Sequence, residues 1–309
     1  MTMYALVFLG CALLLLFASK IVYAQVIVLA DKLRVPPFLV SLLLVAFSTS
    51  IPELFVGVTS AVDSVPTLSL GDVLGSNIVN LTFIAGLTML VGRKRTTLHQ
   101  SMSRKQLAMN FGVALAPILL VLDGTLSRAD GILLLLLYIA YIYISLAGSH
   151  RVGKSLKGKD VEIARSLGIF FFGAFLLIVG SAGIVKSASV VSASLDISPF
   201  IIGIFAVALS TSLPELVFAI RAAFNRNTEL GLAELVGSCA VNATAVLGLV
   251  AVIRPIFLDA YGAIALTGVF SALTFLAFFF LVGQKTTSPL RGVLLIALYA
   301  AFVLVSIAL

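Results

Sequence analysis

The most informative shortage in this 309-residue sequence is charge. Asp, Glu, Lys and Arg make up only 11% of the residues, while hydrophobic residues make up 61%. A typical soluble domain has about 25% charged residues. The mean hydropathy is correspondingly high, at +1.20. This composition excludes an ordinary soluble domain and predicts a protein that crosses a membrane many times.

Cysteine and histidine are also scarce, with two of each. Cys11 and Cys239 both lie in apolar runs, so we expect free thiols packed as small hydrophobic side chains. Two cysteines permit neither a disulfide framework nor a zinc site. His99 and His150 fall in expected loops, and no aspartate pair lies in the middle of a span. No catalytic constellation is therefore available, and an enzyme is not expected.

Apolar runs occupy most of the chain. About twenty such residues span a bilayer, and the first run is too long for the core of a signal peptide. The longest polar breaks are residues 92–104 and the basic, glycine-rich stretch 149–162. We expect this second stretch to link two halves, 1–148 and 163–309. The sequence predicts ten spans, at 3–30, 36–62, 67–91, 105–122, 129–148, 163–193, 197–224, 228–252, 259–282 and 288–308.

The formal net charge of +7, from 20 Lys and Arg against 13 Asp and Glu, indicates membrane topology. Basic residues gather in cytoplasmic loops, so the excess is no sign of nucleic-acid binding. With the N-terminus outside, the inner loops hold most of the basic residues, and the outer side holds little beyond Arg128 and Arg254. We therefore expect both termini outside the cell membrane and the 149–162 linker inside.

The two halves are repeats. Residues 45–54 read Val-Ala-Phe-Ser-Thr-Ser-Ile-Pro-Glu-Leu, and residues 207–216 read Val-Ala-Leu-Ser-Thr-Ser-Leu-Pro-Glu-Leu. The same offset of 162 residues relates Pro37-Phe38 to Pro199-Phe200, Gly75-Ser76 to Gly237-Ser238 and Asn80 to Asn242. Each half has five expected spans, an odd number, so the second half is inverted. Inverted repeats are typical of secondary transporters, whose site lies between the repeats near the midplane.

The repeated motif has the chemistry of a cation site. A glutamate is costly inside a membrane and usually marks a substrate path. Pro52 and Pro214 have no N–H, so each leaves a carbonyl four residues back without its helical partner. Carboxylate, hydroxyl and carbonyl oxygens together are ligands for a hard cation. The alternative is a simple proline kink whose hydroxyls bond back onto their own helix.

A second polar stripe follows in each half. Asp72, Ser76 and Asn80 share one helix face, and Glu234, Ser238 and Asn242 repeat them. The Gly-Ser pairs also suit close helix packing, which is compatible with a site. Asp72 and Glu234 fall near the starts of their spans, where the helix dipole and interfacial water favour acids. The alternative is that they attract cations on the approach to the site, Asp72 from outside and Glu234 from inside. Lys20, well inside the first span, either snorkels or pairs within the bundle.

These motifs resemble the two alpha repeats of the cation/calcium exchanger superfamily, in its sodium/calcium exchanger branch of small ten-span prokaryotic proteins. The resemblance covers the whole chain in span number and repeat layout. It implies an all-α membrane protein of ten helices in two inverted five-helix repeats. The second, third, seventh and eighth spans would form a compact core, and the long, tilted first and sixth would slide to alternate access.

The resemblance also implies roles for individual residues. Calcium would bind Glu53 and Glu215 with the backbone oxygens of Thr49 and Thr211. Asn80 and Asn242 would line the site as polar neighbours. Sodium would share Glu53, Glu215 and Thr211 and would add the backbone of Ala46 and Ala208 and the side chains of Ser50, Ser212, Ser76 and Ser238.

The sequence departs from the family pattern at several positions. Ser48 and Ser210 stand where glycine is usual, and Asp72 and Glu234 where asparagine is common. Asn242 replaces an aspartate of some potassium-dependent relatives, which disfavours potassium coupling. The Gly-Asn-Ala motif typical of proton/calcium exchangers is absent.

Two carboxylates in a site of low dielectric constant repel each other, and one divalent cation or several sodium ions would neutralise them. One ligand cluster that takes either load produces exchange by competition. We therefore expect a secondary active antiporter of calcium and sodium that works as a monomer in the lipid bilayer and needs no cofactor. The alternatives are a proton-coupled calcium exchanger, and a cation channel, which would pass current without a counter-ion.

Overall fold

The computed structural model describes residues 2–32, 49–92, 104–147, 160–258, 261–282 and 288–308. Almost all of these residues are helical. In the described ranges eight helices are long and apolar enough to cross a membrane, or nine if one bent pair counts as a single span. Ten spans are therefore not reached in this part of the chain. Residues 36–48 of the expected second span lie outside it.

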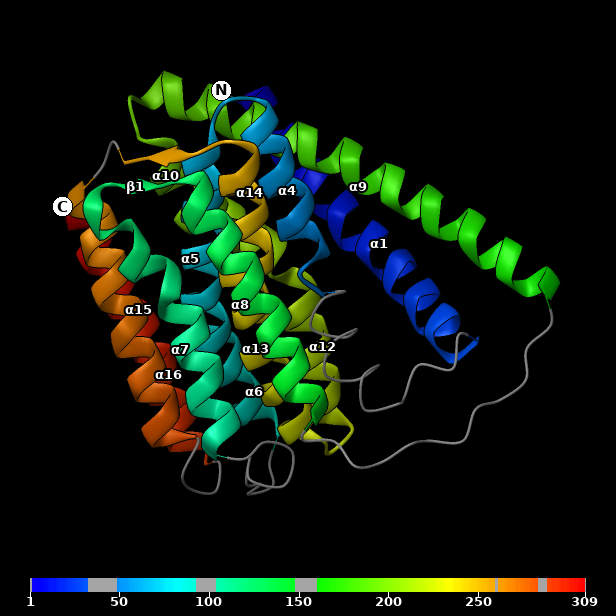
Figure 1. Cartoon of the computed structure of the whole chain (residues 1–309). Helices are drawn as coiled ribbons and strands as arrows, with labels where there is room; N and C mark the ends of the chain where they lie inside the picture. Colours follow the sequence, from blue (N-terminus) through cyan, green and yellow to red (C-terminus); the bar gives the residue numbers. More distant parts are fainter. Residues whose placement is uncertain are drawn as a thin grey trace.

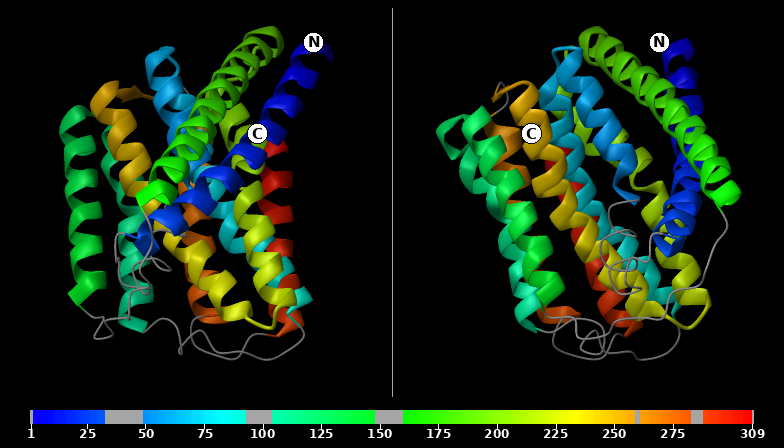
Figure 2. Two further views of the ribbon diagram at one scale, coloured as in Figure 1. Left: turned by 90° about the vertical axis from the view of Figure 1, so that its right-hand side faces the viewer. Right: turned by 45° about the vertical axis from the view of Figure 1, so that its right-hand side comes forward.

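Two long helices lie obliquely across the rest of the bundle. They are α1 (Thr2–Lys32) and α9 (Asp160–Leu195), which run side by side (Figures 1 and 2). At 1.5 Å per residue they measure about 46 and 54 Å, longer than the roughly 30 Å of membrane hydrocarbon, so each must tilt. A side chain at Gly183 would collide with Cys11 Sγ, so Cys11 packs between the two helices.

Two helical hairpins form the centre of the bundle, one from each half. The first comprises α4 (Ile51–Val62), α5 (Pro66–Val79), the π-helical turn η2 (Asn80–Ile84) and α6 (Ala85–Val91). The second comprises α10 (Pro199–Ile202), the π-helical turn η5 (Gly203–Val207), α11 (Ala208–Thr211), α12 (Leu213–Phe224), α13 (Thr228–Val241), the π-helical turn η6 (Asn242–Val246) and α14 (Leu247–Ile253).

Burial separates this core from the helices around it. In the spans Pro66–Val91 and Thr228–Ile253, 83% of the most apolar window is buried, against 17–39% in the six other single-helix spans. The expected third and eighth spans therefore lie at the centre. The bundle matches the all-helical, two-repeat arrangement that the sequence predicts.

The surrounding helices are α7 (Arg104–Leu120), α8 (Arg128–Ala147), α15 (Tyr261–Leu281) and α16 (Pro289–Ala308). Helix α8 crosses α14 where Gly131 meets Gly248, and α16 crosses α6 where Gly292 meets Gly86. A Cβ atom on Gly86 would lie 2.6 Å from the Gly292 carbonyl oxygen. Gly86 and Gly248 are 162 residues apart. The repeat is thus visible in the packing, with small residues at equivalent crossings.

Both chain termini lie at one end of the bundle, which we call the terminal end (Figure 1). It carries the α4–α5 turn and a short 3-10 turn, η4 (Val121–Asp123). It also carries strands β1 (Thr125–Leu126) and β2 (Ile256–Phe257), which pair in antiparallel fashion. The opposite end, which carries the α12–α13 turn at residues 225–227, we call the linker end.

Candidate cation-binding site

Each repeated motif breaks a helix and begins a new one. Helices α11 and α12 are bent by 43° at Ser212. Ser50 and Ser212 stand at the N-caps of α4 and α12 with nearly identical backbone angles, φ −79° and ψ 4° against φ −78° and ψ 6°. Proline follows in the first turn of both helices, and it interrupts the helical hydrogen bonding. The break places Glu53 and Glu215 in first turns, beside the positive ends of the helix dipoles.

Four acidic side chains meet in the core. Glu53, Asp72 and Glu215 are 0% exposed, and Glu234 is 5% exposed. The Glu215 carboxyl lies close enough to those of Glu53 and Glu234 for their charges to interact, and Glu53 lies similarly close to Asp72. Among the described residues no lysine or arginine side chain is buried. The cluster therefore has no internal positive charge to offset it, and a buried charge without a partner is costly.

Hydrogen bonds between the halves hold two of these acids. Thr211 Oγ1 donates to Asp72 Oδ1 over 2.8 Å, and Thr49 Oγ1 donates to Glu234 Oε1 over 2.6 Å. The two bonds are equivalent, because both threonines and both acids are related by the 162-residue offset. The expectation that Asp72 and Glu234 lie in interfacial water is wrong. Each is buried two helical turns or less into its span, against the threonine motif of the other half.

The serines break this symmetry. Ser238 Oγ donates to Glu215 Oε1 over 3.0 Å, so Ser50 Oγ, 3.0 Å from Ser238 Oγ, is the donor in that contact. Ser76 Oγ instead lies 3.4 Å from Asp72 Oδ1 and 3.5 Å from the Ala208 carbonyl oxygen. The equivalent bonds to Glu53 and from Ser212 are not formed.

Many oxygens in this centre are left without hydrogen-bond partners. They include both carboxylate oxygens of Glu53 and one each of Asp72, Glu215 and Glu234. The hydroxyl of Ser212 and the side-chain amides of Asn80 and Asn242 are also unpartnered and buried. Native proteins bond nearly all such groups, so these oxygens are available to accept from water or to bind a cation.

Asn80 and Asn242 occupy equivalent local structures. Each begins a π-helical turn, η2 or η6, at the centre of its span. Such turns are rare and often lie at functional sites. They follow directly on the serine stripe of α5 and α13.

The two halves meet at Asn77 and Cys239, a contact that the sequence motifs do not predict. Asn77 Nδ2 donates to the Cys239 carbonyl oxygen over 3.4 Å, and Cys239 Sγ lies 3.9 Å from the Asn77 carbonyl oxygen. These two residues are themselves 162 apart, so the pseudo-twofold axis passes between them. The 162-residue offset pairs these two residues, but it does not show that they are in contact. Cys239 is buried and free, as expected.

Glycines allow α5 to approach the opposite motif. A Cβ atom on Gly75 would lie 2.4 Å from the Ile204 carbonyl oxygen, and one on Gly71 would lie 2.2 Å from that of Phe200. The packing role of the Gly-Ser pair is therefore real in α5. It coexists with the position of Ser76 beside Asp72 and Thr211. Of the residues expected in the site, Ala46 lies outside the described residues, as does Ser48.

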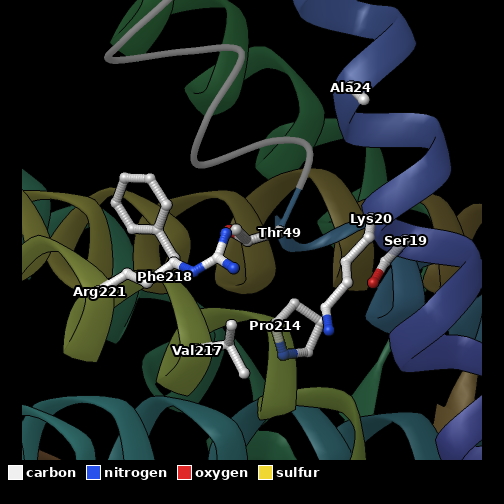
Figure 3. A pocket seen from close by; sticks show the side chains of 8 residues that line it. All are labelled: Ser19, Lys20, Ala24, Thr49, Pro214, Val217, Phe218 and Arg221. Atoms are coloured by element: carbon white, nitrogen blue, oxygen red, sulfur yellow. The ribbon is translucent and has the colours of Figure 1, made fainter.

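A cavity of about 320 Å³ lies between α1 and α12 and reaches the site (Figure 3). Thr49 and Pro214 line it, together with Lys20 of α1 and Arg221 of α12. The Lys20 and Arg221 side chains extend into the cavity (Figure 3), and neither forms an ion pair with a described residue. Lys20 is exposed, and it pairs with no acid among the described residues.

A tight contact occupies the equivalent place in the other half. Thr59 Oγ1 of α4 and Ser181 Oγ of α9 are 2.9 Å apart and share a hydrogen bond. The 162-residue offset relates Thr59 to Arg221 and Ser19 to Ser181. Ser19 and Arg221 both line the cavity. The bundle is therefore closed between α4 and α9 and open at the equivalent place between α1 and α12.

The donor set suits hard cations such as Ca²⁺ and Na⁺, which bind carboxylate, amide, hydroxyl and carbonyl oxygens. Within the described ranges no group of three or more His, Cys, Asp or Glu side chains is arranged to hold a metal ion by itself. A cation here would thus need neutral oxygens as well as carboxylates.

Comparisons with known proteins find relatives over most of the chain. The chain is 30% identical over 302 residues to the inner membrane protein YrbG of Escherichia coli K12, with 94% of this chain and 91% of that protein covered. It is 25% identical to the sodium/calcium exchanger MaX1 of Methanosarcina acetivorans, covering 90% and 91% of the two chains.

The fold resembles solved structures of the sodium–calcium exchanger NCX_Mj. For one of them the TM-score is 0.69 at 22% sequence identity, with 98% of this chain and 99% of the other covered. The family model described as "sodium/calcium exchanger protein" matches residues 3–147 and 165–308. These two matches cover both repeats and most of the chain, so this integral membrane protein belongs to the sodium/calcium exchanger family.

Proposed function

We propose that the protein is a secondary active antiporter that exchanges Ca²⁺ for Na⁺ across the membrane by alternating access. One observation carries the proposal. Four buried carboxyl groups from both halves share a centre in which no buried lysine or arginine is described, and five of their oxygens lack partners. Cations from solution are the natural charge to fill it.

The proposed ligands follow the repeat. Glu53 and Glu215 would hold Ca²⁺ with the backbone oxygens of Thr49 and Thr211, while Asn80 and Asn242 line the position. Sodium ions would take the same glutamates and Thr211, and would add the backbone of Ala46 and Ala208 and the hydroxyls of Ser50, Ser76, Ser212 and Ser238. Because the two loads compete for shared oxygens, one leaves before the other binds. Asp72 and Glu234 would hold the threonines in place and add negative charge.

The two equivalent helix contacts suggest how access alternates. In this structure α4 and α9 are joined by the Thr59–Ser181 hydrogen bond, while the cavity keeps Ser19 and Arg221 apart. We infer that the site is open toward the linker end. Sliding of α1 and α9 would exchange the open and closed sides. We assign ten spans, the halves 1–148 and 163–309, an inner linker at 149–162, outer termini and a monomeric transport unit.

A proton-coupled exchanger is the second candidate, and one observation favours it. Four acids, not two, are buried together, and protons on two of them would relieve the repulsion without sodium. In a cation channel the same cluster would conduct without any counter-ion.

Calcium uptake into proteoliposomes separates these candidates. We expect uptake driven by an outward sodium gradient at equal pH on both sides, and little uptake with a pH gradient alone. Uptake driven only by the pH gradient would overturn sodium coupling and favour the proton-coupled exchanger. A calcium current with neither counter-ion would indicate a channel.

A further inference from the structure

A second cavity lies at the terminal end, away from the candidate cation site. Its volume is about 530 Å³, and it lies among the start of α5, the start of α8 and the segment after α14. Its walls include Arg128, Arg254, Ser64, Thr67, Ile253 and Phe257. Small-molecule sites have volumes of about 300–1,000 Å³, so the cavity has the size of a ligand site.

Two exposed arginines in this cavity have no partner among the described residues. Arg128 and Arg254 form no hydrogen bond or ion pair with any described residue. The acids nearest to Arg128 along the chain are engaged elsewhere, because Asp123 accepts from Thr125 N and Asp130 accepts from Ser127 N and Oγ. Two guanidinium groups facing one cavity are an arrangement that binds phosphate or carboxylate.

The beginning of α5 adds unpaired donors to the same wall. Thr67 is 8% exposed, yet neither its hydroxyl nor its N–H has a partner among the described residues. No side chain caps α5, Pro66 has no N–H, and the first turn holds no acid. Helix N-termini of this kind favour anions, since the free N–H groups and the helix dipole point the same way.

The other repeat supplies the missing charge from its own sequence. At the position equivalent to Thr67, helix α13 has Glu229, an acid in its first turn. The position equivalent to Arg254 is Gly92, and the glycine crossings, which pair Gly131 with Gly292, make Pro289 the equivalent of Arg128. The linker-end copy thus has a carboxylate and lacks these two arginines. The terminal-end copy has the arginines and has a threonine in place of Glu229, so an anionic ligand would meet two cations there and no first-turn acid.

We propose that the terminal-end cavity binds a phosphate group, carried by an anionic phospholipid headgroup or present as free phosphate. The phosphate oxygens would accept from both guanidinium groups and from Thr67. The lipid is the source that the surroundings favour. Phe257 and Ile253 are 64% and 37% exposed apolar wall residues, and the cavity lies at the ends of membrane spans, at headgroup depth. The site is independent of the ion that the protein exchanges.

Native mass spectrometry of the purified full-length protein tests this proposal. The probes are phosphatidylglycerol, phosphatidylcholine as a zwitterionic comparison, and inorganic phosphate alone. The site variant is Arg128→Gln with Arg254→Gln, and Thr67→Val is a second, milder variant. Lys186→Gln is the matched control, because Lys186 is an exposed cation on α9 that does not line the cavity. Elution from a sizing column checks folding.

We expect phosphatidylglycerol to bind the wild type more tightly than phosphatidylcholine. The double arginine variant should weaken that binding by about tenfold or more, since hydrogen bonds to charged groups are the strong ones. Lys186→Gln should leave it unchanged. Binding of inorganic phosphate alone, lost in the same variant, would support the site and identify free phosphate as its source. The proposal would be overturned if phosphatidylglycerol bound no more tightly than phosphatidylcholine and inorganic phosphate did not bind. An equal loss of binding in Lys186→Gln would also overturn it.

Discussion

Unpaired negative charge is the dominant feature at the scale of single residues. Glu53 has two buried oxygens without a partner, while Glu215 receives one hydrogen bond from Ser238. In the empty protein such groups destabilise the fold, because a buried charge loses its hydration. A bound cation would neutralise this charge, and the relief of the cost would strengthen cation binding. The two glutamates are related by the repeat but are not identical in their surroundings.

Neutralising either glutamate should abolish calcium exchange without unfolding the protein. In Glu53→Gln or Glu215→Gln a divalent ion meets one carboxylate fewer, so its dehydration is no longer offset. Loss of outer-shell partners of a metal ion costs roughly 10–100-fold, so loss of a direct ligand should lower exchange by more than about 100-fold. The measurement is calcium exchange in proteoliposomes.

The control for this prediction is Asp196→Asn, which removes an exposed acid at the terminal end. It should exchange calcium normally. Both glutamine variants should elute from a sizing column as the wild type does, because losing an unpaired buried charge relieves the empty protein. Near-normal exchange by either variant would exclude a shared calcium site.

Individual residues also mark the limit of prediction from sequence. The repeat offset singled out Glu53, Glu215, Ser76 and Ser238 as candidates, because a glutamate duplicated within apolar runs is costly unless it serves a site. It misplaced Asp72. Distance from the start of a span suggested interfacial water, whereas the side chain meets Thr211 of the other half. Contacts between halves depend on helix register and rotation, which spacing within one half does not contain.

At the scale of elements, the eight long apolar helices of the described ranges were predictable and their irregularities were not. Hydropathy identified the long helices α1 and α9, and proline identified the breaks at Ser50 and Ser212. Two equivalent π-helical turns, at Asn80 and Asn242, have no comparable signal. A π-turn changes which backbone groups pair while leaving hydropathy unchanged. Burial of the neighbouring helices determines whether such a turn is tolerated.

Separation of α4 from α9 is the movement that we expect transport to require. Thr59 Oγ1 and Ser181 Oγ are only 2.9 Å apart, so cysteines at both positions should form a disulfide in this conformation. We expect oxidation of Thr59→Cys with Ser181→Cys, in a background with Cys11→Ala and Cys239→Ala, to stop exchange. A reductant should restore it. Calcium flux before and after reduction is the measurement.

A second cysteine pair provides the comparison. Ser19→Cys with Arg221→Cys joins the equivalent positions, which are separated by the cavity. This pair should cross-link only when the first pair is free, because one contact closes as the other opens. Unchanged exchange after full oxidation of the first pair would mean that α4 and α9 do not separate during transport.

At the scale of the whole molecule, the halves agree in the site and differ at its approaches. The threonine–acid bonds, the Asn77–Cys239 contact and the glycine crossings all follow the 162-residue offset. Lys20 and Arg221 do not, because their equivalents in the other half are Ala182 and Thr59. The site and both approaches lie between helices of the two halves, but the charged side chains occur at only one approach. In the proposed mechanism, cations that leave toward the linker end would pass Lys20 and Arg221, which have no positive counterpart at the equivalent positions of the other half.

This charge asymmetry makes the orientation in the membrane a consequential prediction. We expect Ser149→Cys, in the basic linker outside the described residues, to react with a membrane-impermeant maleimide only after cells are opened. Leu122→Cys, at a position 76% exposed at the terminal end, should react in intact cells. Both are made without Cys11 and Cys239. The reasoning is that basic loops stay in the cytoplasm, and residues 149–162 contain four Lys or Arg residues against two acids. Labelling of Ser149→Cys in intact cells would reverse the orientation. The Lys20–Arg221 cavity would then open outward, and the two arginines of the terminal-end cavity would face the cytoplasmic leaflet.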